Sequence, residues 1–138
     1  MKPVNEWEGE PNRKHWVDEA TGLDCLILRG PVRSLCGYVG VPDDHPWHGM
    51  DYNCPAIENL DVHGGITYAD ACSGRICHGT EHGDKPAHEH VWWFGFDCAH
   101  AGDLVPNLGK ITDDEVYRNI AYVEAHCAKL ATQLKEAT

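Results

Sequence analysis

The chain has 138 residues, 42% of them hydrophobic, a size and composition typical of one globular domain with its own core. Its 22 acidic residues outnumber 11 lysines and arginines, which gives a formal net charge of −11. This charge repels phosphate backbones, so we expect no nucleic-acid partner; metal cations and neutral or cationic small molecules fit it better. No apolar run approaches the roughly 18 residues of a membrane-spanning helix, and residues 1–7 lack the apolar segment of a signal peptide. We therefore expect a cytoplasmic protein that does not enter a membrane.

Ten histidines and seven cysteines give the chain many side chains that could bind a transition metal. An odd number of cysteines argues against a complete set of disulfides. In a reducing compartment, we expect these cysteines to be free thiols or metal ligands.

The N-terminal half predicts an extended arm followed by an antiparallel meander. Residues 1–12 contain prolines, a glycine and several acidic residues, a composition typical of a surface arm. Turn residues then separate three strand-like segments, which are Lys14–Asp18, Leu23–Arg29 and Leu35–Val41.

The remainder predicts two more strands, three long loops and a helix. The strands cover about Leu60–Tyr68 and Val91–Phe96, and the loops cover 42–61, 69–90 and 97–111. A helix over 113–136 is indicated by Thr112 and Glu115, which form a capping box, and by an apolar stripe at alternating spacings of four and three. The stripe consists of Val116, Ile120, Val123, Cys127, Leu130 and Leu134. The sequence thus predicts one α+β domain over 1–138, with a mostly antiparallel sheet of about five strands, one long C-terminal helix packed on it and long irregular loops.

Ionisable residues gather where two predicted strands end. His63 precedes Gly64-Gly65, and an aromatic strand leads directly into Asp97, His100 and Asp103. Because a rigid strand followed by a loop fixes side chains and leaves them reachable, we expect these groups to meet in space. His63, Asp97 and His100 would hold zinc, iron or manganese, with Asp103 as fourth ligand or general base. Metal-assisted hydrolysis is the reaction that such a site favours.

Two other interpretations of the same residues stay open. In the first, the chain is a non-catalytic binding or interaction module, in which Asp97 caps the turn that follows it and His100 pairs with Asp97 or Asp103. In the second, Cys98 is a nucleophile activated by His63 or His100, with Asp97 orienting the imidazole.

A second metal site is suggested by the loop between the last two predicted strands. Its cysteines and histidines have pair spacings within the range of zinc ligands, although the gap between the two pairs is short. The ligands of this structural zinc site would be Cys72, Cys77, His82 and His88.

Several segments resemble a family of small uncharacterised proteins from bacterial and phage genomes. The resemblance covers most of residues 16–134. It rests on Gly22–Arg29, Leu35–Pro42 with His45-Pro46, Val62–Tyr68, Trp92–Asp103, Tyr117-Arg118 and Tyr122-Val123. The family has no established activity, so the resemblance implies kinship and, through its phage members, an accessory or host-interaction role.

Overall fold

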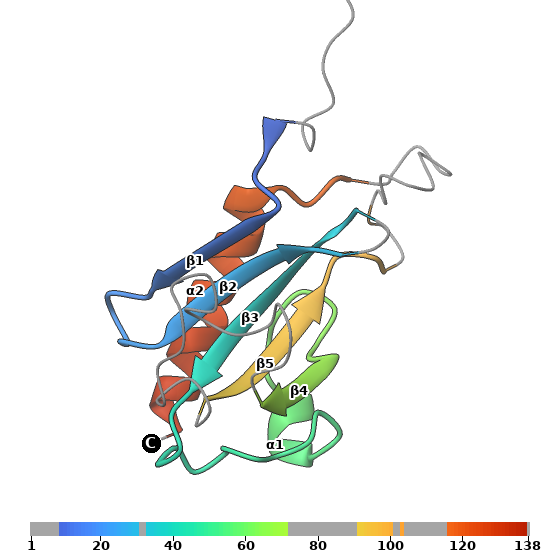
Figure 1. The fold of residues 1–138 in the computed structure, drawn as a ribbon. Coiled ribbons are helices and arrows are strands. Elements are labelled where there is room, and N and C mark those ends of the chain that lie inside the picture. Colours follow the sequence, from blue (N-terminus) through green and yellow to red (C-terminus); the bar gives the residue numbers. More distant parts are fainter. Residues whose placement is uncertain (1–8, 31–32, 72–90, 101–102, 104–115, 138) are drawn as a thin grey trace, which may run out of the picture.

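The protein is an antiparallel sheet with one long helix across a face, as seen in the computed structural model (Figure 1). The structure describes residues 9–30, 33–71, 91–100, 103 and 116–137. This architecture confirms the α+β class expected from the sequence.

The sheet has five strands in the order β1-β2-β3-β5-β4, and every neighbouring pair is antiparallel. Strand β5 returns between β3 and β4, so β4 occupies an edge of the sheet. The bounds are β1 Arg13–Val17, β2 Asp24–Arg29, β3 Leu35–Val41, β4 Tyr68–Ala71 and β5 Trp92–Asp97. The predicted meander of the first three strands is therefore confirmed.

The predicted strand over Leu60–Tyr68 is wrong, because β4 begins only at Tyr68. Its backbone before that point contains two consecutive left-handed residues, Gly64 with φ of 70° and Gly65 with φ of 78°. Such angles interrupt an extended strand, and glycine adopts them without the cost that a side chain brings. The segment is instead a loop that carries His63.

Helix α2 covers Ile120–Glu136, seven residues shorter at its start than predicted. Residues 116–119 are not helical, and Asn119 caps the helix by accepting a hydrogen bond from the Tyr122 amide at 2.9 Å. The Glu10 carboxylate accepts a second one from the Ile120 amide at 2.8 Å. The capping box at Thr112 and Glu115 lies outside the described residues.

The core lies between α2 and the sheet face formed mainly by β3 and β2. The helix contributes four fully buried side chains of the predicted stripe, Val123, Cys127, Leu130 and Leu134. They pack with sheet residues such as Ile27, Val39, Phe94 and Phe96. Burying each large apolar side chain contributes about 1.5–3 kcal/mol, so this contact holds α2 in place.

A second apolar cluster lies on the other face of the sheet. Leu26, Leu28, Tyr38, Val91 and Trp93 form it, and all five are buried. Successive residues of a strand point to opposite faces, so β2 and β5 contribute to both clusters. In the described part of the chain, no helix is long and apolar enough to cross a bilayer.

A short helix, α1 (Pro55–Glu58), lies within the segment predicted to be a loop over 42–61. Its Ile57 is fully buried in the main core. Nearby, the Trp92 indole donates a 2.9 Å hydrogen bond to the Met50 carbonyl. These contacts hold the segment against the sheet.

Candidate functional site

The structure brings part of the predicted strand-end site together and adds residues from α2. We call His63, His100, Asp103, Arg118, Tyr122 and His126 the polar cluster. They come from the loop before β4, the chain after β5, the residues preceding α2, and the first two turns of α2.

Asp103 is the centre of the polar cluster. Its side chain is fully buried, and its carboxylate accepts three hydrogen bonds. The donors are Arg118 Nε at 2.8 Å, His63 Nε2 at 2.9 Å and the His100 amide at 3.0 Å. Burial by itself raises the pKa of Asp103, but these donors together outweigh it and hold the pKa below its ordinary value. The group is therefore a carboxylate at neutral pH.

His63 connects Asp103 to helix α2. Because a carboxylate only accepts, the ring donates from Nε2 to Asp103. Its Nδ1 lies 2.7 Å from the Tyr122 hydroxyl, which donates to it when the ring is neutral. The His63 amide also donates to Nδ1 of His126 at 3.0 Å. Both ring nitrogens of His63 are thus occupied by side chains of the protein.

Asp97 and His100 face each other beside this network. Asp97 accepts hydrogen bonds from the Ala99 amide at 3.1 Å and the Thr67 hydroxyl at 3.2 Å, so it caps the turn after β5. His100 Nε2 lies 3.1 Å from Asp97 Oδ1, close enough for an ion pair but not aligned for a hydrogen bond. The contacts that the non-catalytic interpretation assigns to Asp97 and His100 are therefore present.

The predicted metal triad of His63, Asp97 and His100 does not form. Among the described residues, no three histidine, cysteine, aspartate or glutamate side chains are placed to hold one ion. The ring centres of His63 and His100 are 6.1 Å apart, but His63 has both nitrogens engaged with Asp103 and Tyr122. Asp97 is directed to its own turn. Cys72, Cys77, His82 and His88 lie outside the described residues.

Cys98 is a core residue and not a reachable nucleophile. It is 2% exposed and belongs to the main apolar cluster, whereas its neighbour Asp97 is only half-buried. Burial, and then the negative charge of Asp103, raise the pKa of the Cys98 thiol far above its ordinary value. Because the thiolate is the reactive form, this environment argues against catalysis by Cys98.

Three residues of the polar cluster were missing from the predicted site, and all three are on α2 or just before it. Arg118, Tyr122 and His126 are spaced by four residues, the spacing that places side chains along one face of a helix. This polar spacing beside the apolar stripe is the signal that sequence reasoning could have used. The guanidinium of Arg118 also lies over the Tyr122 ring, 4.9 Å from its centre.

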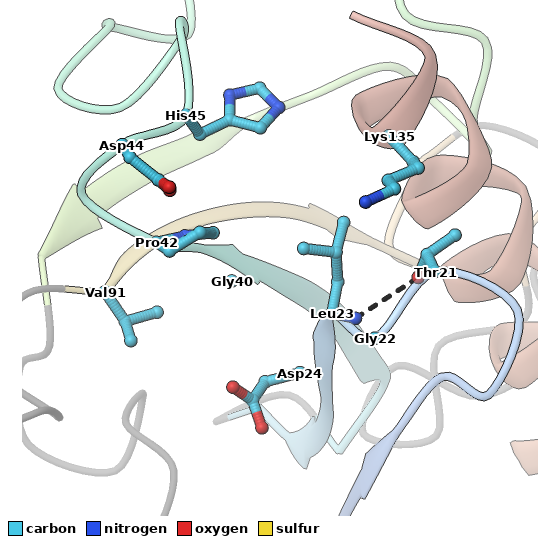
Figure 2. A pocket seen from close by; sticks show the side chains of 10 residues that line it. All are labelled: Thr21, Gly22, Leu23, Asp24, Gly40, Pro42, Asp44, His45, Val91 and Lys135. Carbon is cyan, nitrogen blue, oxygen red and sulfur yellow. Dashed lines mark hydrogen bonds between the residues drawn. The ribbon is translucent and has the colours of Figure 1, made fainter. Parts of the chain in front are cut away.

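A cavity lies at the opposite end of the sheet and near the end of α2. Its volume is about 410 Å³, within the range of roughly 300–1,000 Å³ that is usual for small-molecule sites. Four parts of the chain meet there, namely the β1–β2 turn, the end of β3 with the loop after it, the residue before β5 and the last turn of α2. The lining residues are those labelled in Figure 2: Thr21, Gly22, Leu23, Asp24, Gly40, Pro42, Asp44, His45, Val91 and Lys135.

The cavity has polar groups on several sides. Thr21 and His45 are engaged inside the protein: the Thr21 hydroxyl donates to Asp18 at 2.7 Å, and His45 lies 2.7 Å from the Leu134 carbonyl. The charged groups of Asp44 and Lys135 extend from opposite sides into the space between them (Figure 2).

A scan against models of protein families and searches of curated proteins and solved structures found nothing that matches this chain.

Proposed function

We propose that this protein is a binding module that holds a small polar organic molecule in the cavity between the β1–β2 turn, β3 and the end of α2. The observation that carries this proposal is the cavity itself, with a volume of about 410 Å³ and a wall built from four separate parts of the chain. An apolar surface with a few convergent polar groups is the usual character of a ligand site.

The hydrogen bonds within the polar cluster support the same proposal. Asp103 and His63 have their hydrogen-bonding atoms engaged with each other and with Arg118, Tyr122 and a backbone amide. A buried carboxylate with three donors ties the chain after β5 and the loop before β4 to α2. This cluster holds loops to the start of α2, and the cavity lies apart from it near the end of the helix.

Nuclear magnetic resonance of the ¹⁵N-labelled full chain with a library of small polar fragments tests this proposal. Bound fragments are expected to shift the amide signals of Leu23, Gly40 and Val91, which line the cavity. The amides of His63 and Asp103 should not shift.

A matched pair of variants locates the binding. Asp44→Trp places a large ring at the cavity wall and should remove the shifts, while Asp43→Trp adds the same ring one residue earlier, outside the lining. Both aspartates are exposed, so each variant should fold. A library without any compound that shifts the cavity amides, or shifts that persist in Asp44→Trp, would overturn the proposal.

Hydrolysis without a metal is a second candidate function, supported by the chain of contacts from Asp103 through His63 to Tyr122. A carboxylate, an imidazole and a hydroxyl in this order can pass a proton from the hydroxyl to the ring, which activates the oxygen as a nucleophile. Mass spectrometry after incubation with 4-nitrophenyl acetate should then show acetyl on Tyr122, lost in His63→Gln. Acetylation confined to lysines would contradict this candidate.

A further inference from the structure

The Asp44 carboxylate is the charged group through which the cavity can recognise a ligand. It extends into the cavity from the loop after β3, at an exposed position (Figure 2). Among the residues that the structure describes, none forms a hydrogen bond or an ion pair with this carboxylate. Because a carboxylate only accepts hydrogen bonds, its best partner is a positively charged donor. This side of the cavity therefore favours a cation.

The loop that carries Asp44 is held in place by the protein itself. The His45 amide donates to the Pro42 carbonyl at 3.1 Å, which closes a turn that contains Asp44. The His45 ring is 5% exposed; its Nδ1 accepts the Trp47 amide at 3.0 Å and its Nε2 lies 2.7 Å from the Leu134 carbonyl. A ring that accepts at Nδ1 and donates from Nε2 is neutral, so it adds no charge to the cavity. A binding group fixed in this way loses little freedom when a ligand arrives.

The two other charged side chains of the cavity are already engaged within the protein. Asp24 is in contact with the His15 ring at 3.1 Å, and Lys135 also has an interaction inside the chain. We therefore assign neither of them to the ligand. The formal charge of −11 attracts cations and repels anions, so a carboxylate on the ligand would meet an unfavourable field and gain no partner.

The remaining surface of the cavity decides between kinds of cation. Leu23, Pro42 and Val91 supply apolar surface, and Leu23 and Val91 are buried. None of the lining residues labelled in Figure 2 is a phenylalanine, tyrosine or tryptophan, whose rings recognise quaternary ammonium groups. A primary ammonium group instead donates hydrogen bonds, which a carboxylate can accept. The surface thus fits a primary ammonium group on an apolar body.

Resting on the proposed binding function, we infer that the ligand is a small primary amine with one positive charge and an apolar body. Its ammonium group donates hydrogen bonds to the Asp44 carboxylate. Its body lies on Leu23, Pro42 and Val91. Binding requires no contact with Lys135.

A titration of the ¹⁵N-labelled full chain at neutral pH tests this inference with isopentylamine and phenethylamine as probes. The amide signals of Leu23, Gly40 and Val91 report binding. Isopentyl alcohol and phenethyl alcohol have the same bodies without the charge, whereas L-leucine and L-phenylalanine are the same amines with an added carboxylate. Each amine is expected to bind at least about tenfold more tightly than its alcohol, which corresponds to about 1.4 kcal/mol. Each amine should also bind more tightly than its amino acid.

Three near-isosteric variants assign the charge recognition to one side chain. In Asp44→Asn, the preference for the amine over the alcohol should disappear. Asp43→Asn removes the same charge one residue earlier, outside the lining, and should keep the preference. Lys135→Gln should keep it as well. All three positions are exposed, so the fold should tolerate these changes, and the amide spectrum of each free variant checks this.

The outcomes separate the ligand class from the binding function itself. Equal binding of amines and alcohols, or amino acids that bind as tightly as the amines, would overturn the inference. A preference that persists in Asp44→Asn, or that is lost equally in Asp43→Asn, would overturn it too. In each of these cases the proposed function stands, because a compound still shifts the cavity amides. If no compound of any kind shifts them, both proposals are overturned.

Discussion

The two ends of helix α2 differ in how their polar side chains are used. Near its start, the polar cluster directs its buried groups at one another, with Asp103 accepting three hydrogen bonds. Near its end, Asp44 and Lys135 point into a cavity of about 410 Å³ (Figure 2). The first arrangement holds loops to a helix, while the second places charged groups at the border of a cavity. A high density of ionisable residues in a sequence therefore does not by itself mark a binding site, because the fold can use such residues to hold its own segments together.

Removing the Asp103 carboxylate, the centre of the polar cluster, should have the largest effect on stability. Asp103→Ala leaves the Arg118 guanidinium, the His63 ring and the His100 amide without their acceptor, so the free energy of unfolding should fall by about 3 kcal/mol. Urea denaturation followed by tryptophan fluorescence measures this. Asp103→Asn keeps an acceptor oxygen and should lose less. A loss below about 1 kcal/mol for Asp103→Ala would mean that the cluster does not stabilise the fold.

The glycine pair before β4 allows a matched test of the packing beside His100. An added Cβ at Gly64 would lie 2.4 Å from the His100 ring, whereas one at Gly65 would meet nothing within 4 Å. Both have positive φ, so each change to alanine carries about 1 kcal/mol of backbone strain. We expect Gly64→Ala to cost about 2 kcal/mol in total, because the ring must also move away from Asp97. Equal unfolding free energies for the two variants would show that contact with the His100 ring does not affect stability.

Stability should depend on pH through His126. Its pKa lies below the ordinary 6.5 because burial, and then the positive charges of His63 and Lys129, disfavour the protonated ring. Below pH 6.5 the unfolded chain therefore binds this proton more readily than the folded protein. The stabilisation that comes from the neutral His126 ring is complete above the pKa of this residue in the unfolded chain. It is lost as the pH falls through the pKa of His126 in the folded protein.

Urea denaturation at pH 7.5 and 5.5 checks this dependence. Wild type should lose more stability on acidification than His126→Gln, in which the amide oxygen can still accept the hydrogen bond from the His63 amide. A larger loss in the variant would contradict the assigned sign.

Substitutions of the charged residues at the cavity should have the smallest effect on stability. Lys135→Gln and Asp44→Asn change exposed side chains, so each should alter the free energy of unfolding by less than about 0.5 kcal/mol. Urea denaturation followed by tryptophan fluorescence measures these changes. A loss above about 1 kcal/mol in either variant would show that these charges stabilise the fold, and the contrast between the two ends of α2 would fail.

Much of the fold could be predicted from the sequence because its signals are local. Alternation and turn residues placed β1, β2, β3 and β5 to within one residue at each end. The apolar stripe of α2 was also found, since a period of 3.6 residues is a property of the sequence itself. The start of the helix was missed because Asn119 and Glu10, which is distant in the sequence, supply its caps.

The candidate site was predicted only in part, because its contacts are between residues distant in sequence. The expectation that His63 and Asp103 meet is confirmed by a 2.9 Å contact across 40 positions of the chain. Their partners Arg118 and Tyr122 approach only because α2 packs across the sheet. The cavity depends on four separate segments and has no signature in any one of them.

The sequence by itself determined the acidic charge, the strand and helix periods, and the group of ionisable residues that follows β5. Only the tertiary structure decided which of those residues bind one another, that Cys98 faces the core, and that charged groups of α2 and the loop after β3 border a cavity. The reason is physical: a period is set by neighbours along the chain, whereas hydrogen-bond satisfaction and enclosed space are set by the packing of distant elements.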